Sequence, residues 1–78
     1  MTTTEPFLEV WVVYRRPVDV PAAAFVVRVH EIGAGQVLAT DRWWSAPRLA
    51  QARAWIPAGL VCVPREPSDD PAIVEVWL

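Results

Sequence analysis

Few residues in this chain could carry out nucleophilic or acid–base chemistry. Its 78 residues include one histidine, His30, one cysteine, Cys62, and the serines Ser45 and Ser68. A catalytic nucleophile needs a base within hydrogen-bond reach and a third group that orients the base. Ser45 stands at the start of a helical pattern, where we expect it to be the N-cap, and His30 and Cys62 belong to separate predicted strands with opposite expected faces. The sequence therefore predicts that the protein is not an enzyme.

Metal and phosphate sites are not predicted either. A zinc site needs about four Cys or His ligands at short spacings, and the chain has two such residues in total. One loop carries Glu66, Asp69 and Asp70, but the alternating ligands and central glycine of a calcium loop are missing, and a turn before a strand explains these acids. Gly33 and Gly35 join two predicted strands in a hairpin turn, whereas the glycines of a dinucleotide site lie between a strand and a helix. We therefore expect no cofactor and no metal.

Composition and charge limit the partners that the chain could have. It has a net charge of −2, five tryptophans and no lysine, so its seven basic residues are all arginines. An acidic balance argues against general nucleic-acid binding, because contacts with phosphate dominate that affinity. The start of the chain lacks the pattern of a secretory signal, no apolar run approaches the ~20 residues of a membrane span, and a single cysteine cannot form an intrachain disulfide. These features predict a cytoplasmic protein with no membrane contact.

A small number of elements must position these residues. Runs rich in β-branched and aromatic residues predict five strands, and one segment has the apolar spacing of a helix of about three turns. The expected strands cover 7–16, 24–32, 36–44, 60–63 and 73–78, the helix covers 45–57, and 1–6 form a flexible arm. A helix this short is marginal alone, so it must lie on a sheet. The sequence thus predicts a single α+β domain over 1–78, with a mostly antiparallel sheet of four to five strands in the order β-β-β-α-β-β and one helix packed on one face.

One face of the predicted sheet is expected to remain open. We expect the helix to cover the face that carries Val10, Val12, Val27, Val29, Val74 and Val76. The candidate interaction surface on the other face consists of Trp11, Arg28, His30, Arg42, Glu75 and Trp77, with Glu9 and Thr40 beside them. Trp and Arg are enriched at the cores of protein interfaces, which favours a role in recognition. The other interpretation is a solvated face in which arginine stems cover the indoles and acids pair with arginines, and both interpretations stay open.

The other three tryptophans, Trp43, Trp44 and Trp55, are expected outside the candidate interaction surface or in the core. Trp43 and Trp44 are adjacent in a strand, so they must point to opposite sides of the sheet, and we expect one of them to lie in the core under the helix. Trp55 lies off the apolar stripe of the predicted helix. It could seal the end of the helix or form a second apolar patch.

The closing segment IVEVWL could be a docking peptide or a strand of the sheet. Three apolar residues alternate there with Glu75 and Trp77, which is the pattern of a strand with a core face and an open face. The strand is the favoured interpretation, and Trp77 is then expected to share the open face with Trp11.

Two stretches of the chain, RPVDVPAAAFVVR near the start and IPAGLVCVPREPSDDPAIVEVWL at the end, are similar to a group of short uncharacterised bacterial proteins. The shared features are the proline-flanked Asp19 before the second strand and a terminal strand of the form DDPxIVExW, which runs here from Asp69 to Trp77. The resemblance implies a small cytosolic bacterial domain of the kind associated with mobile elements or phages. Because the group carries no known activity, the resemblance assigns no functional residues.

These observations predict a small non-catalytic module that binds a protein partner or a second copy of itself through the Trp/Arg-rich face. Single-stranded nucleic-acid binding through the same face is an alternative, because aromatic and arginine side chains on a sheet can stack bases. Glu9 and Glu75 on that face argue against it. A small enzyme or enzyme subunit is a further alternative, with His30, Arg28 and Arg42 as its polar cluster.

Overall fold

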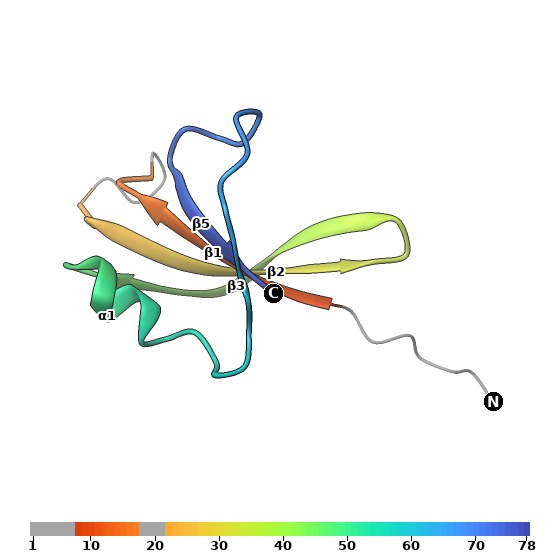
Figure 1. The fold of residues 1–78 in the computed structure, drawn as a ribbon, viewed down its shortest axis with the longest axis horizontal. Coiled ribbons are helices and arrows are strands. Elements are labelled where there is room, and N and C mark those ends of the chain that lie inside the picture. The colour runs from red at the N-terminus through yellow and green to blue at the C-terminus, as the bar shows by residue number, and fades with distance from the viewer. Residues whose placement is uncertain (1–7, 18–21) are drawn as a thin grey trace.

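Five strands form one antiparallel sheet, and one short helix lies against it (Figure 1). The computed structural model describes residues 8–17 and 22–78. The elements are β1 (Leu8–Arg15), β2 (Phe25–Gly33), β3 (Gln36–Ala46), α1 (Leu49–Arg53), β4 (Cys62–Val63) and β5 (Ile73–Trp77). Across the sheet the strand order is β3-β2-β1-β5-β4, and every neighbouring pair is antiparallel. The predicted α+β class and element order are confirmed, whereas the predicted arm over 1–6 and Asp19 lie outside the described residues.

A two-residue turn joins β2 to β3. Gly33 pairs with Gln36, and the turn residues Ala34 and Gly35 both have left-handed backbones, with φ of 50° and 73°. Two consecutive positive φ values are typical of the type I′ turn, whose twist matches that of the flanking strands. Glycine adopts this conformation readily, but an alanine is strained in it. The hairpin predicted at this glycine-rich connection is therefore present.

β3 contains extra residues opposite the middle of β2. Between the pairs Arg28–Trp43 and His30–Ala39, β3 has two residues more than β2. The hydroxyl of Thr40 donates to a carbonyl of β2 at 2.6 Å and accepts a backbone N–H of β3 at 3.1 Å, which holds the irregular backbone in place. Because the insertion is even in length, the side chains on either side of it keep the same alternation between faces.

The helix is shorter than predicted and begins later. α1 covers Leu49–Arg53, and Ser45 lies in β3, paired with β2, so the predicted N-cap is wrong. The helix begins after Arg48, which makes no side-chain capping hydrogen bond. The cause is Pro47, because a proline holds the preceding residue extended and so favours continuation of β3 to Ala46. A helix of this length is not stable by itself, which means that packing against the sheet must hold α1.

The core lies between α1 and one side of the sheet, which we call the helix face. Its buried residues are Trp11, Val13, Val27, Val29, Ala46 and Ala52. The register pairs Trp11 with Val29, which puts Trp11, rather than Val10 or Val12, beneath the helix and corrects the prediction for β1. β1 is apolar on both sides, and an indole removes more apolar surface from water than a valine does.

From Glu75 on, β5 also faces the opposite way from the prediction, whereas Val74 packs against the core as predicted. The pairs Trp11–Trp77 and Val13–Glu75 put Glu75 and Trp77 on the helix face, and Val76 lies on the other face. The prediction that IVEVWL is a sheet strand is confirmed by the bounds of β5. The prediction that Trp11 and Trp77 share a face is also correct, but the face is the one that the helix covers.

Candidate interaction surface

The structure does not bring the six predicted surface residues together on one face. The register and the contacts of Arg42 assign four of them to the helix face: Trp11, Arg42, Glu75 and Trp77. The other two, Arg28 and His30, lie on the opposite face. The single Trp/Arg-rich surface expected from the sequence is therefore divided between two sides of the sheet.

Three tryptophans form a stack on the helix face. The ring centroids of Trp11 and Trp44 are 5.6 Å apart with an interplanar angle of 3°, and those of Trp44 and Trp55 are 5.1 Å apart with an angle of 12°. Trp11 is only 5% exposed. Such pairs contribute ~0.5–1.5 kcal/mol beyond their buried area. Trp11 thus stabilises the fold and is not accessible to a partner, and Trp55 closes the stack from the C-terminal side of α1.

The contacts of Arg42 are those expected of a solvated face, in which an arginine covers an indole and pairs with an acid. Its guanidinium carbon lies 5.6 Å from the ring centroid of Trp11, and its Nη1 lies 2.5 Å from Oε2 of Glu9. Both charged side chains are nearly half exposed, so the ion pair contributes at most about 1 kcal/mol. Arg42 therefore fits the solvated interpretation of the Trp/Arg pattern rather than a role in recognition.

A buried carboxylate links β5 to α1. Glu75 is 5% exposed, and both of its oxygens accept hydrogen bonds from the Arg53 guanidinium, the shortest at 2.6 Å from Nη2 to Oε1. The indole N–H of Trp77 also donates to Oε2. The hydrogen bond from Arg53 is the main cause that lowers the pKa of Glu75, with a further lowering by Trp77, while burial opposes the shift. The same bond raises the pKa of Arg53.

One signal for this pair is present in the sequence but was not used to predict it. Arg53 has the helical spacing of the buried stripe, and Glu75 is the only charged residue within the last predicted strand. A charge among apolar residues on each of two packed elements is typical of an ion pair between them, because a carboxylate that is buried, as Glu75 is, needs a charged partner. The pair is structural, since its charges satisfy each other.

The side of the sheet away from α1, which we call the helix-free face, has a different composition. It consists of the even-numbered residues of β1 and β2, the odd-numbered residues of β3 outside its insertion, and Val63 with Val76. Reciprocal backbone hydrogen bonds join Val61 and Leu78, so their side chains extend this face by one further pair.

Exposed apolar side chains are concentrated on the helix-free face. Eight large apolar side chains are exposed among the described residues. Six of them belong to this face: Leu8, Ile32, Val37, Trp43, Val61 and Leu78. The other two, Leu38 and Trp55, lie on the helix side. Leu8, Ile32 and Val37 face one another across three strands, so they form a continuous apolar row.

The polar groups of the helix-free face are few and engage aromatic rings. The Tyr14 hydroxyl lies 3.0 Å from Nε2 of His30, and the Arg28 guanidinium carbon lies 6.0 Å from the ring centroid of Trp43. Burial, and to a lesser degree the charge of Arg28, lowers the pKa of His30. The imidazole is therefore neutral at neutral pH, and in the tautomer that carries its proton on Nδ1 the Nε2 atom accepts a hydrogen bond from the Tyr14 hydroxyl. As predicted, Trp43 and Trp44 point to opposite sides.

His30, Arg28 and Arg42, the polar cluster considered for an enzyme, do not come together. Arg42 is on the helix face, whereas Arg28 and His30 are on the helix-free face. Of the cavities lined by described residues, one has a volume of about 400 Å³ and another of about 250 Å³, and His30 lines neither of these two. Over residues 8–17 and 22–78, no cluster of three or more His, Cys, Asp or Glu side chains could hold a metal ion, and no helix has the length and apolar character needed to cross a membrane.

Comparison of the chain with protein-family models, with curated proteins and with solved structures found no match.

Proposed function

We propose that the protein is a non-catalytic self-associating module whose helix-free face packs against the same face of a second copy. The observation that carries the proposal is the concentration of exposed apolar side chains on this face, six of the eight among the described residues. Exposed apolar surface gathered on one side of a small domain is typical of an interface. A helix already covers the other face, so a second layer can be added only on the helix-free face, where Val10, Val12 and Val26 are already buried within the chain.

The charge distribution suits a second copy. The carboxylates of Glu9 and Glu75 are on the helix face, so two helix-free faces can meet without burying those acids. The imidazole of His30 is neutral at neutral pH because burial and Arg28 lower its pKa. Arg28 lies against the ring of Trp43, which supplies part of its environment before association. Few charges would therefore have to leave water.

The size of the chain supports the same conclusion. A domain of 78 residues buries a smaller fraction of its surface than a larger domain does, and oligomerisation is one common way to add stability. Two sheets pack face to face about 10 Å apart. A two-fold axis between them would give each copy the same contacts, as in most homodimers. The result would be a four-layer arrangement with the helices outside.

Two exposed tryptophans provide a direct test. Trp43 is 40% exposed on the helix-free face, and Trp55 is 49% exposed on the helix side. The indole N–H signals of the two side chains can be followed by NMR as the protein concentration is raised from about 10 µM to 1 mM. We expect the Trp43 signal to shift with concentration and the Trp55 signal to stay in place. Equal shifts of both signals, or of neither, would contradict the proposal.

Single-stranded nucleic-acid binding is a second candidate, and one observation favours it. Trp43, Tyr14 and Arg28 share the helix-free face, and Glu9 and Glu75, which argue against it in the sequence, lie on the other side of the sheet. Aromatic rings beside an arginine can stack bases. The test is the fluorescence anisotropy of labelled oligonucleotides at low salt.

Micromolar oligonucleotide binding that Trp43→Ala abolishes would favour this second candidate. Absence of binding at tens of micromolar would exclude this candidate, because non-specific nucleic-acid contacts already give dissociation constants of about that size. The net charge of −2 remains unfavourable, which is why self-association is the main proposal.

A further inference from the structure

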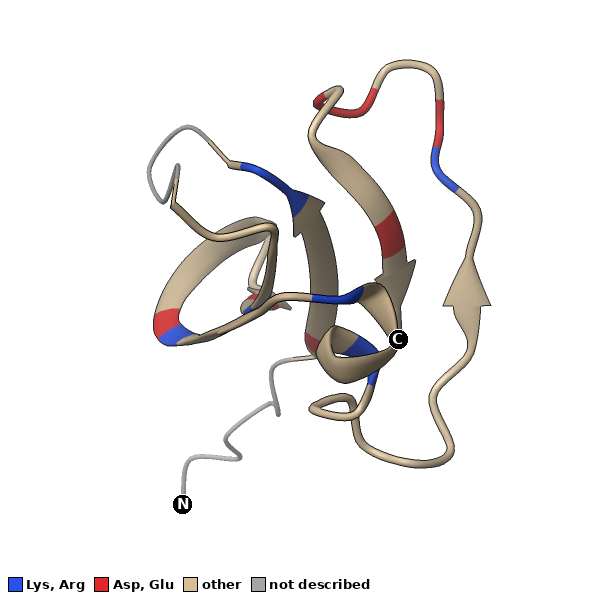
Figure 2. Cartoon of the chain, turned by 90° about the vertical axis from the view of Figure 1, so that its left-hand side faces the viewer, with Lys and Arg blue, Asp and Glu red and all other residues tan. Residues whose placement is uncertain are grey.

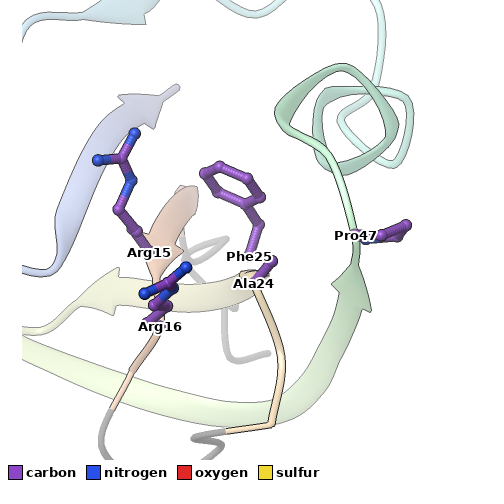
Figure 3. Close-up of a pocket in the computed structure, with 5 residues that line it drawn as sticks. All are labelled: Arg15, Arg16, Ala24, Phe25 and Pro47. Carbon is purple, nitrogen blue, oxygen red and sulfur yellow. The ribbon is translucent and has the colours of Figure 1, made fainter.

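We propose that a cavity at the end of β1 binds a phosphomonoester attached to an aromatic body. The cavity is lined by Arg15, Arg16, Ala24, Phe25 and Pro47 and has a volume of about 400 Å³ (Figure 3). Arg15 pairs with Phe25 on the helix side of the sheet, so this site is separate from the helix-free face. The proposal therefore does not depend on self-association.

An unusual backbone conformation brings two adjacent arginines to one cavity. Neighbouring residues of a regular strand point to opposite faces. Arg16, however, has a φ of 45°, a left-handed conformation that residues other than glycine seldom adopt. Backbone hydrogen bonds fix the chain there, from the N–H of Arg16 to the carbonyl of Ala24 at 2.9 Å and from the N–H of Arg15 to that of Ala72 at 2.7 Å. Such strain is most often retained at functional sites.

The two guanidinium groups supply the charge that a phosphate needs. Within residues 8–17 and 22–78, neither Arg15 nor Arg16 forms an ion pair with a carboxylate; the ion pairs there are Arg42–Glu9 and Arg53–Glu75. The blue stretch at the end of β1 in Figure 2 marks the two adjacent arginines. A phosphomonoester carries about −1.5 to −2 charges at neutral pH, and guanidinium groups bind its oxygens in a planar, bidentate manner.

The remaining walls suit an aromatic body rather than a bare ion. The Arg15 guanidinium carbon lies 5.8 Å from the ring centroid of Phe25. In Figure 3 both arginines lie on one side of the Phe25 ring and Pro47 lies on the other. A volume of about 400 Å³ is within the ~300–1,000 Å³ range of small-molecule sites. A ring could stack on Phe25 while its phosphate lies between the arginines.

The full chain can be titrated with phenyl phosphate, with adenosine monophosphate and with inorganic phosphate, using isothermal calorimetry or amide NMR shifts. We expect at least one of the two aromatic esters to bind at least about fivefold more tightly than inorganic phosphate, because the free ion cannot stack. The relative affinities of the two esters then distinguish an aryl ester from a nucleotide as the source of the phosphate. No binding of either ester at about 10 mM, or equal binding of all three probes, would overturn the proposal.

Matched variants locate the binding site. Arg15→Gln removes one guanidinium, and Arg16→Gly removes the other while it relieves the left-handed backbone, so the second variant should fold at least as well as the parent. Each should weaken ester binding at least about tenfold. Arg65→Gln, in the loop between β4 and β5, should leave it unchanged. Unchanged binding in both pocket variants, or an equal loss in Arg65→Gln, would show that the cavity is not the site.

Discussion

At the scale of single residues, the bond between Arg53 and Glu75 decides how α1 is held. The helix has five residues and no side-chain N-cap, so little inside it favours the helical state. Glu75 lies in the core and accepts bonds from both Arg53 and Trp77. The pair thus ties the last residue of α1 to β5, and through Trp77 it also orders the neighbour of Trp11.

Removal of the arginine should therefore cost stability. Arg53→Ala leaves a buried carboxylate without its main partner. Loss of one member of a buried pair costs about 3–5 kcal/mol, but the Arg53 side chain is half exposed and water screens its charge, so we expect a decrease of about 1–2 kcal/mol in the free energy of unfolding. Urea denaturation measures this change. Arg65→Ala serves as the control, and a similar decrease there would contradict the assignment.

The same bond predicts a pH dependence. The pKa of Glu75 is lowered in the folded protein, chiefly by Arg53. Its ionised form therefore adds stability in full above the unfolded value of about 4.3, and this stability is lost as the pH falls through the lower folded pKa. We expect the acid destabilisation to be smaller in Arg53→Ala than in the parent chain. Identical pH profiles for the two proteins between about pH 2 and 5 would show that Arg53 does not set this pKa.

At the scale of elements, the hairpin of β2 and β3 carries much of the helix-free face. Its turn has positive φ at both Ala34 and Gly35. A side chain at Gly35 would meet no atom within 4 Å, so any cost of substitution there comes from the backbone alone.

Two exchanges at this turn should act in opposite directions. Ala34→Gly should relieve left-handed strain, and Gly35→Ala should create it, with changes of about +0.5 and −1 kcal/mol in the free energy of unfolding. The gain is the smaller of the two because glycine also increases the entropy of the unfolded chain. Thermal unfolding of both variants measures the difference. The turn assignment is wrong if the order is reversed.

The elements also show what the sequence can and cannot predict. Alternation and turn residues were sufficient for the element order, the hairpin and the opposite directions of Trp43 and Trp44. They could not assign the face of β1, because Val10 and Val12 alternate with Trp11 and Val13, and both sets are apolar. The choice depends on which set meets the helix, and this is a long-range contact. If β1 is assigned to the wrong face, Trp11 is placed on the open surface instead of in the core. For this reason the candidate site was predicted less well than the fold.

At the scale of the whole molecule, the sheet separates two kinds of surface. The helix face holds the main core cluster, the tryptophan stack and the two ion pairs Arg42–Glu9 and Arg53–Glu75. The helix-free face holds most of the exposed apolar side chains and few charges. The arginine-lined cavity lies at the end of β1. A dimer formed through the helix-free face would leave this cavity accessible on each copy, so association and ligand binding could operate together.

The most direct test of the central claim compares two neighbouring residues of β3. Val37 is 67% exposed on the helix-free face, and Leu38 is 44% exposed on the helix side. Sedimentation equilibrium should give a mass that rises toward twice the chain mass for the parent protein and for Leu38→Glu. Val37→Glu would bury a charge in the interface, so it should remain monomeric or weaken association at least about thirtyfold. A monomeric parent protein at millimolar concentration, or equal association of the two variants, would contradict the account.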